Sequence, residues 1–190
     1  MAECLLSDRI ENALRRKEIG TLRRDYLNLL ETNPFPSISG KHYPTVLAAF
    51  KRENRDIGPY TAITPFEAAN RIASDLTLME GVLQLFRKNL IPEDARVQLR
   101  LGTMQQKDKG DFSVKVGNKE YQGEAFDVNP SFFRSKLGKT ISSWKEKKAP
   151  LKYVIFNSDC LKDAACNTFF LGVKDRNRSV SFLGVRSWHI

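Results

Sequence analysis

The chain has 190 residues with a formal net charge of +9, and 41% of its residues are hydrophobic. This length fits one domain with a small appendage, and no apolar run approaches the roughly 20 residues that cross a bilayer, so we expect no membrane segment and no membrane partner. A surface this basic attracts polyanions, and nucleic acid is therefore the leading expected partner.

Residues 1–60 are predicted to form an N-terminal helical region. The spacing of apolar residues predicts helices within 6–14, 22–30 and 43–50. A break rich in glycine, proline and polar residues follows at 53–60. We expect the main α/β unit to occupy residues 61–190 and to pack with the first region as one compact body.

The strongest helix signal begins at Thr64. The run TPFE supplies a capping threonine, a proline at the first helical position and a glutamate three residues after the cap. Apolar residues then gather on one side of the helix: Phe66, Ala69, Ile72, Ala73, Leu76, Met79, Leu83 and Phe86. Glu80 falls inside this stripe, and a buried carboxylate needs compensation. Two partners remain open for it, a metal ion or a nearby arginine or lysine.

After this helix the apolar period changes from helical to alternating. The alternation predicts a three-stranded meander at 95–101, 112–116 and 120–128. Asp111 opens the second strand, Glu124 lies in the third, and a tight turn at Gly117 joins them. Lys115 falls on the same side of its strand as Asp111. We expect the two hairpin arms to bring Asp111 and Glu124 within reach of one cation.

The last third of the sequence predicts a basic helix, a strand and a hairpin, at 131–148, 151–157 and 169–185. An odd number of cysteines, three, is typical of a reducing compartment, which favours a cytoplasmic location. Cys160 and Cys166 lack the spacing of a structural zinc site, so we interpret them as buried or inert thiols.

From Thr64 onward the predicted order is helix, strand, strand, strand, helix, strand, with Glu80, Asp111 and Glu124 on the first, third and fourth of these elements. This arrangement resembles the core of the PD-(D/E)XK, or restriction-endonuclease-like, superfamily of nucleases. The resemblance implies an α/β fold, here with an N-terminal helical region and a C-terminal hairpin. It also implies that the three acids bind Mg²⁺ or Mn²⁺ for phosphodiester hydrolysis, with DNA ranked above RNA as substrate and a homodimer as one expected assembly.

The sequence departs from the family pattern at two positions. Phe126 stands where the motif has its lysine, and Gly110 precedes Asp111 where the motif has proline. Lys136 and Lys115 are the candidates to replace the missing lysine, which in the family orients the attacking water. If no lysine serves, a noncatalytic nucleic-acid-binding domain is the alternative, and a plain interaction module is the third reading.

Overall fold

The computed structural model describes residues 3–37, 42–102, 109–144, 147 and 150–186. Its helices are α1 (Ser7–Ile10), α2 (Arg16–Thr32), α3 (Tyr43–Arg52), α4 (Pro65–Arg87), α5 (Pro130–Ser143) and α6 (Ala164–Arg176), with a 3-10 helix η1 (Ser158–Lys162). Its strands are β1 (Arg55–Ile57), β2 (Tyr60–Ile63), β3 (Arg96–Leu99), β4 (Phe112–Val116), β5 (Lys119–Phe126), β6 (Leu151–Asn157) and β7 (Ser181–Val185). The α/β class is as the sequence predicts, and so is the order of elements from α4 to β6.

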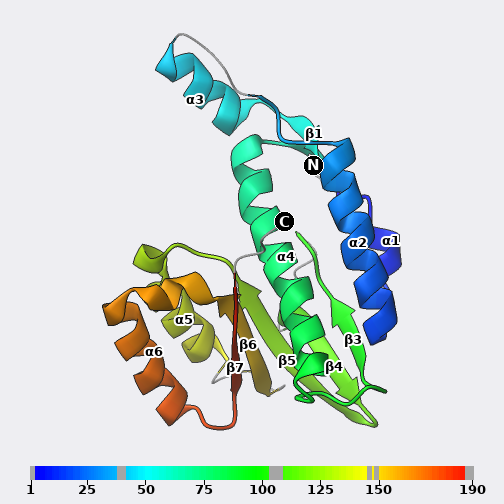
Figure 1. The fold of residues 1–190 in the computed structure, drawn as a ribbon, viewed down its shortest axis with the longest axis vertical. Helices are drawn as coiled ribbons and strands as arrows, with labels where there is room; N and C mark the ends of the chain where they lie inside the picture. Colours follow the sequence, from blue (N-terminus) through cyan, green and yellow to red (C-terminus); the bar gives the residue numbers. More distant parts are fainter. Residues whose placement is uncertain (1–2, 38–41, 103–108, 145–146, 148–149, 187–190) are drawn as a thin grey trace.

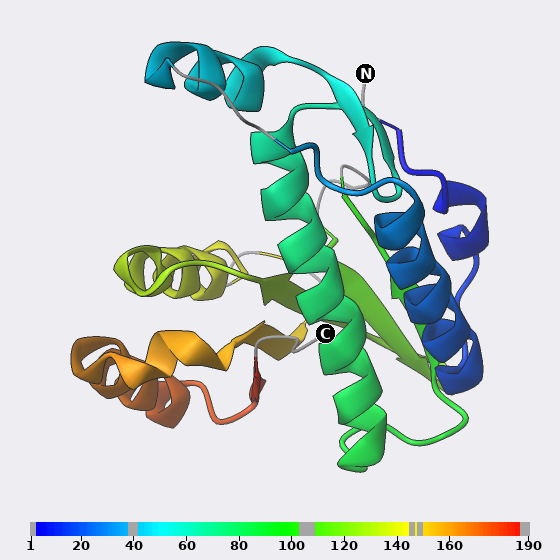
Figure 2. The same ribbon diagram turned by 45° about the horizontal axis from the view of Figure 1, so that its top comes forward.

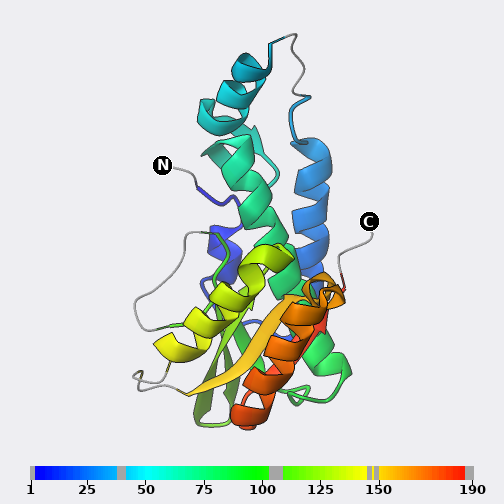
Figure 3. The same ribbon diagram turned by 90° about the vertical axis from the view of Figure 1, so that its left-hand side faces the viewer.

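A five-stranded mixed sheet in the order β3-β4-β5-β6-β7 forms the centre of the fold. Strands β3, β4 and β5 are antiparallel neighbours, whereas β5, β6 and β7 run parallel. Helix α4 crosses one face of this sheet beside α2 (Figures 1 and 2), and α5 and α6 cover the opposite face (Figure 3). Side chains alternate accordingly: Ala125 and Ile155 pack into the cluster that contains α4, and Phe126 and Phe156 into the cluster with α5 and α6.

Helix α4 begins where the sequence predicts. Thr64 caps it, because its Oγ1 accepts a hydrogen bond from the Glu67 backbone N–H at 3.2 Å, and Pro65 occupies the first turn. The helix lies between the sheet and α2, so its buried surface is wider than a single stripe and includes Asp75. Phe66, predicted to lie on the buried side, is instead 49% exposed, because it lies on the side of α4 opposite the buried Ala68.

The N-terminal region is less purely helical than predicted. Helices α2 and α3 form, but α1 is only four residues long, and the break predicted at 53–60 contains β1 and the start of β2, paired as an antiparallel hairpin. Leu14 adds a single bridge to Val97 at the edge of the main sheet. Leu22 and Tyr26 of α2 belong to the same buried cluster as α4, so residues 1–60 and 61–190 share one core. Helix α3 lies at the end of the molecule farthest from α5 and α6 (Figures 1 and 3).

The predicted C-terminal hairpin is wrong. Residues 164–176 form α6, which Asp163 caps by accepting a hydrogen bond from the Cys166 N–H at 2.8 Å, and β7 pairs in parallel with β6. Phe170 and Val173 of α6 are three residues apart, and both side chains are buried. That spacing places them on one face of a helix, and the same spacing would put them on opposite faces of a strand.

Cys160 and Cys166 are free thiols buried in the α5 and α6 cluster, as expected. Each Sγ donates to a backbone carbonyl, of Val128 at 2.8 Å and of Pro130 at 3.2 Å. Burial raises the pKa of Cys160 to about 11, which keeps this thiol protonated and unreactive at neutral pH. Over the part of the chain that the structure describes, no helix is both long and apolar enough to cross a membrane.

Candidate functional site

Asp111 and Glu124 meet where β4 begins beside the second half of β5. The ladder pairs Phe112 with Gly123, which makes Asp111 and Glu124 the next facing positions on the two strands. The Asp111 carboxylate turns toward β5, where its Oδ2 accepts a hydrogen bond from the backbone N–H of Ala125 at 2.8 Å. The hairpin thus brings the two acids together, as the sequence predicts.

The Glu124 carboxylate is held from the other side by α5. Trp144, which ends that helix, donates its Nε1–H to Glu124 Oε1 at 2.8 Å. Burial first, and then the charge of Asp111, raise the pKa of Glu124 to about 7, while the Trp144 hydrogen bond and the charge of Lys136 oppose this rise. Two carboxylates forced together in this way share a strong preference for a bound cation, which would replace the proton that Glu124 otherwise retains.

A cavity of about 350 Å³, here named the acid cavity, opens between this acid pair and α5. It is lined by Lys109, Asp111, Glu124, Lys136, Lys139, Thr140, Ser143 and Lys147. The Nζ of Lys147 stands 3.9 Å from the centre of the Trp144 ring, a cation–π contact that places one of these lysines above the residue bonded to Glu124. Two acids surrounded by four lysines can accommodate a metal ion and the phosphate group that it contacts.

The close approach of position 110 to β5 explains why a glycine precedes Asp111 in this chain. A Cβ atom at position 110 would lie 2.2 Å from the carbonyl oxygen of Gly123 on β5, which is closer than real Cβ contacts allow. The Gly110 N–H also donates to Gln122 Oε1 at 3.1 Å, a bond that proline cannot make. The local sequence therefore brings the backbone of residue 110 against β5, and this approach positions Asp111.

Of the two candidate lysines, the structure places only Lys136 at the acid pair. Lys136 projects from α5, lines the acid cavity and approaches the ring of Phe126 to 5.7 Å. Lys115 lies opposite Glu120 in the strand register of the hairpin, and its side chain is exposed. It follows Asp111 by four residues, or about 13 Å along an extended strand.

Glu80 lies away from the acid pair, which corrects its predicted place in the metal site. Its carboxylate makes ion pairs with Arg87 at 3.1 Å and with Arg23 of α2 at 3.5 Å. The sequence left either a metal ion or a basic residue as the partner of Glu80, and in the structure the partners are arginines. Glu80 does not line the acid cavity, because its side of α4 faces α2.

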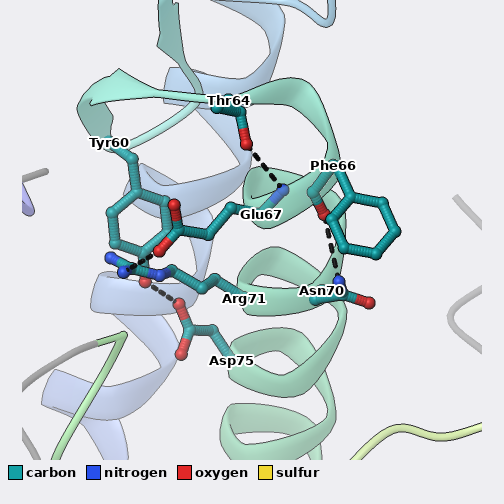
Figure 4. A network of polar contacts seen from close by, with 7 residues as sticks. All are labelled: Tyr60, Thr64, Phe66, Glu67, Asn70, Arg71 and Asp75. Carbon is teal, nitrogen blue, oxygen red and sulfur yellow. Dashed lines mark hydrogen bonds and ion pairs between the residues drawn. The ribbon is translucent and has the colours of Figure 1, made fainter. Parts of the chain in front are cut away.

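The acid of α4 that does approach Asp111 is Asp75, which the sequence analysis missed. It is buried and accepts hydrogen bonds from Tyr26 Oη at 2.8 Å and from the Gly102 N–H at 3.0 Å. It also accepts one from Tyr60 Oη, which Figure 4 shows. Burial raises the pKa of Asp75 to about 6, although these three bonds lower it. Asp75 and Glu80 are five positions apart, about 140° around a helix, so the two acids face different neighbours. The available signal was the position of Asp75 three residues after Ile72 and four before Met79.

A second cavity, of about 400 Å³ and here named the α4 cavity, adjoins the acid pair. It is lined by Asn70, Arg71, Ser74, Asp75, Leu78, Arg100, Gly102, Asp111, Ala125, Phe126, Asp127, Val128 and Lys136. Asp111 and Lys136 line both cavities, so the two cavities adjoin at these side chains.

Within the described ranges no cluster of three or more histidine, cysteine or acidic side chains is arranged around a metal position, so the candidate donor set is the pair Asp111 and Glu124. His42 is exposed at the start of α3 and lines neither cavity. Comparison with protein-family models, with curated proteins and with solved structures finds no match for this chain.

Proposed function

We propose that this protein is a metal-dependent nuclease with a restriction-endonuclease-like core, which hydrolyses phosphodiester bonds of DNA, with RNA as the second choice. The observation that carries the proposal is the facing pair Asp111 and Glu124 in a cavity lined by four lysines. The resemblance seen in the sequence supports it, because α4, β3, β4, β5, α5 and β6 follow in the order that the resemblance implies.

The donor set fits Mg²⁺ or Mn²⁺. Both ions prefer carboxylate oxygens, and the two acids supply hard negative ligands while leaving room for water and substrate. The raised pKa of Glu124 supports the same reading, since a neighbouring negative charge and burial are what a divalent cation would compensate. A bound ion would supply polarisation of the phosphate and a more acidic water.

The remaining chemistry belongs to side chains of this chain. Asp111 and Glu124 would hold the cation, and the hydrogen bonds from Ala125 N–H and Trp144 Nε1–H fix the directions of their carboxylates. Lys136 takes the part of the missing motif lysine: its ammonium group orients the attacking water and stabilises charge on the phosphate oxygens. A lysine on helix α5 can replace the strand lysine of the motif, because the chemistry needs a positive charge beside the phosphate. It does not need that charge to come from a particular strand.

A cleavage assay tests the proposal. Labelled single- and double-stranded DNA and RNA are incubated with Mg²⁺ or Mn²⁺ and with wild type, Asp111→Asn, Glu124→Gln, Lys136→Ala or Lys115→Ala. We expect metal-dependent cleavage that falls at least about 100-fold in the first three variants. Lys115→Ala is the matched control, because it removes the same charge from an exposed site of the same sheet, and it should cleave as wild type does. Equal activity in Asp111→Asn and wild type would overturn the assignment.

The second candidate function is nucleic-acid binding without cleavage. Phe126 favours it, because the usual lysine position carries an apolar ring that packs beneath α5. Binding that persists in Asp111→Asn and Glu124→Gln, with no cleavage by wild type in either metal, would support this candidate. If neither binding nor cleavage occurs, the plain interaction module is left.

A further inference from the structure

Two arginines of the α4 cavity have buried N–H groups that nothing in the described residues accepts. These are Nε of Arg100 and Nη1 of Arg71. Buried polar groups in proteins are nearly always hydrogen-bonded, so a buried donor without an acceptor calls for an explanation. Both residues line the same cavity, and that cavity adjoins the proposed catalytic acids.

Arg100 is only 4% exposed and has neutral partners. Its Nη1 donates to the Gly110 carbonyl at 2.7 Å and its Nη2 to Ser113 Oγ at 3.3 Å. Among the residues that the structure describes, no carboxylate lies within ion-pair distance of its guanidinium group. Burial lowers the pKa of Arg100, and the charges of Glu120, Asp111 and Glu124 offset this lowering only in part, so an anion in the cavity would stabilise the guanidinium group further.

Arg71 is held in position at the same cavity. Its Nη2 pairs with Glu67 one helical turn earlier, and its guanidinium group lies 5.6 Å from the centre of the Tyr60 ring (Figure 4). These two contacts fix the side chain and leave Nη1 for another acceptor. A guanidinium group positioned in advance loses little entropy on binding, and its planar geometry suits phosphate oxygens.

The acidic residues of the cavity already have donors of their own. Asp75 accepts from two tyrosines and a backbone N–H, Asp111 accepts from the Ala125 N–H, and Asp127 accepts from Thr77 Oγ1 at 3.2 Å and from Asn157 Nδ2. The hydrogen-bonding capacity of Asp75 and Asp127 is thus directed largely into the protein. The buried N–H groups without an acceptor in this cavity belong to the two arginines.

We propose that the α4 cavity binds a phosphate group of the substrate strand next to the phosphate that is cleaved, with Arg71 and Arg100 as its recognition residues. That this phosphate belongs to a substrate strand rests on the function proposed above, whereas the anion site itself rests on the two arginines. Because Asp111 and Lys136 line both cavities, a strand anchored here would present its neighbouring phosphate to the acid pair. Such an anchor holds the strand equally in the ground state and the transition state, so its contribution is mainly to substrate binding.

Inorganic phosphate is the probe for the anion site. Metal-free wild-type protein is titrated with phosphate while the Nε–Hε signals of its arginines are followed by ¹⁵N NMR, with chloride at matched ionic strength as reference. We expect the signals of Arg71 and Arg100 to shift together with one dissociation constant, and a short single-stranded oligonucleotide to displace phosphate. Arg71→Gln should weaken phosphate binding about tenfold, since it removes one charge-assisted contact.

Arg87→Gln is the matched control, because Arg87 lies on the same helix but pairs with Glu80 outside both cavities. We test Arg71 because Arg100 also supports the backbone at Gly110 and its loss could prevent folding. In the cleavage assay Arg71→Gln should raise KM about tenfold more than it lowers kcat.

The two proposals fail in different ways. Absence of cleavage together with phosphate shifts at Arg71 and Arg100 would overturn the nuclease and uphold the anion site. Cleavage with an unchanged KM in Arg71→Gln, and no response of either arginine to phosphate, would overturn the anion site and uphold the nuclease. Phosphate binding that the oligonucleotide does not displace would overturn the assignment of the bound group to a nucleic-acid strand.

Discussion

Glu124 links the electrostatics of the acid pair to the stability of the whole protein. In the unfolded chain its pKa is near the ordinary 4.5, whereas in the folded protein burial and Asp111 raise it to about 7. Between these values the folded state binds more protons than the unfolded state, so stability falls as pH rises through this window. The full shift corresponds to at most about 3 kcal/mol of unfolding free energy, reduced by solvent screening because Glu124 is partly exposed.

Glu124→Gln should remove the part of this pH dependence that lies above about pH 6, whereas Asp75, whose pKa burial raises to about 6, keeps a similar dependence below that pH in both proteins. We expect wild type without metal to lose stability between pH 5 and pH 7.5, and the variant to be at least as stable as wild type above pH 7 because it carries no charge beside Asp111. Urea unfolding at several pH values measures the difference. Mn²⁺ should restore stability to wild type, more strongly at higher pH, and should have little effect on the variant. A parallel pH dependence in both proteins above about pH 6 would contradict the assignment.

At the level of single residues, the sequence predicted the acid pair but misplaced the third acid. Asp111 and Glu124 could be predicted because strand pairing and a tight turn fix which positions face each other. Glu80 and Asp75 could not be told apart, because each lies within apolar spacing on α4 and this helix is covered by α2 as well as by the sheet. The element that packs against each side of α4 comes from a distant part of the sequence, so local spacing does not reveal it.

At the level of elements, the approach of residue 110 to β5 makes the hairpin sensitive to one methyl group. Gly110→Ala should displace the strand start, because the new Cβ would meet the backbone oxygen of Gly123. We expect about 2 kcal/mol of destabilisation and weaker Mn²⁺ binding, measured by urea unfolding and calorimetry. Gly20→Ala is the control: outside its own turn of helix no atom lies within 4 Å of the added Cβ, and the change within α2 should stabilise by up to about 1 kcal/mol. Unchanged Mn²⁺ affinity in Gly110→Ala would show that this approach does not position Asp111.

The elements that the sequence predicted well have strong local signals. The alternating strands and the cap at Thr64 are examples, since both depend on residues near in sequence. The misassigned element is α6, where the apolar run at 169–173 suggested a strand although Asp163 supplied a helix cap before it. The β1 and β2 hairpin was missed because its strands are three and four residues long and its turn contains Gly58 with φ of 57°. Short runs carry too few residues to establish a period.

At the level of the whole molecule, the N-terminal region completes the core of the α/β unit. Ile19, Leu22 and Tyr26 of α2 lie in the same buried cluster as α4, and Tyr26 also donates to Asp75. Removing residues 1–60 would expose the apolar side of α4 and leave Asp75 without the Tyr26 and Tyr60 donors. At about 25 cal/mol per Å², exposing about 400 Å² of apolar surface costs about 10 kcal/mol, which is the size of an ordinary domain's stability.

We therefore expect residues 61–190 alone not to fold into the native structure. Circular dichroism and ¹⁵N NMR of the fragment should show loss of cooperative unfolding, and mixing with a peptide of residues 1–60 should restore part of it. A fragment that unfolds cooperatively with the stability of the full chain would contradict this expectation. The homodimer expected from the resemblance stays a prediction, which sedimentation of the full chain can test.

The hydrogen bond from Trp144 to Glu124 gives the site an optical signal of its own. An indole whose N–H faces a carboxylate emits differently when that carboxylate is protonated, ionised or engaged by a cation, and the ammonium group of Lys147 above the ring adds to this sensitivity. The chain contains only one other tryptophan, Trp188. With Trp188→Phe as background, the intrinsic fluorescence of this protein becomes a direct titration of the acid pair, readable without label or substrate.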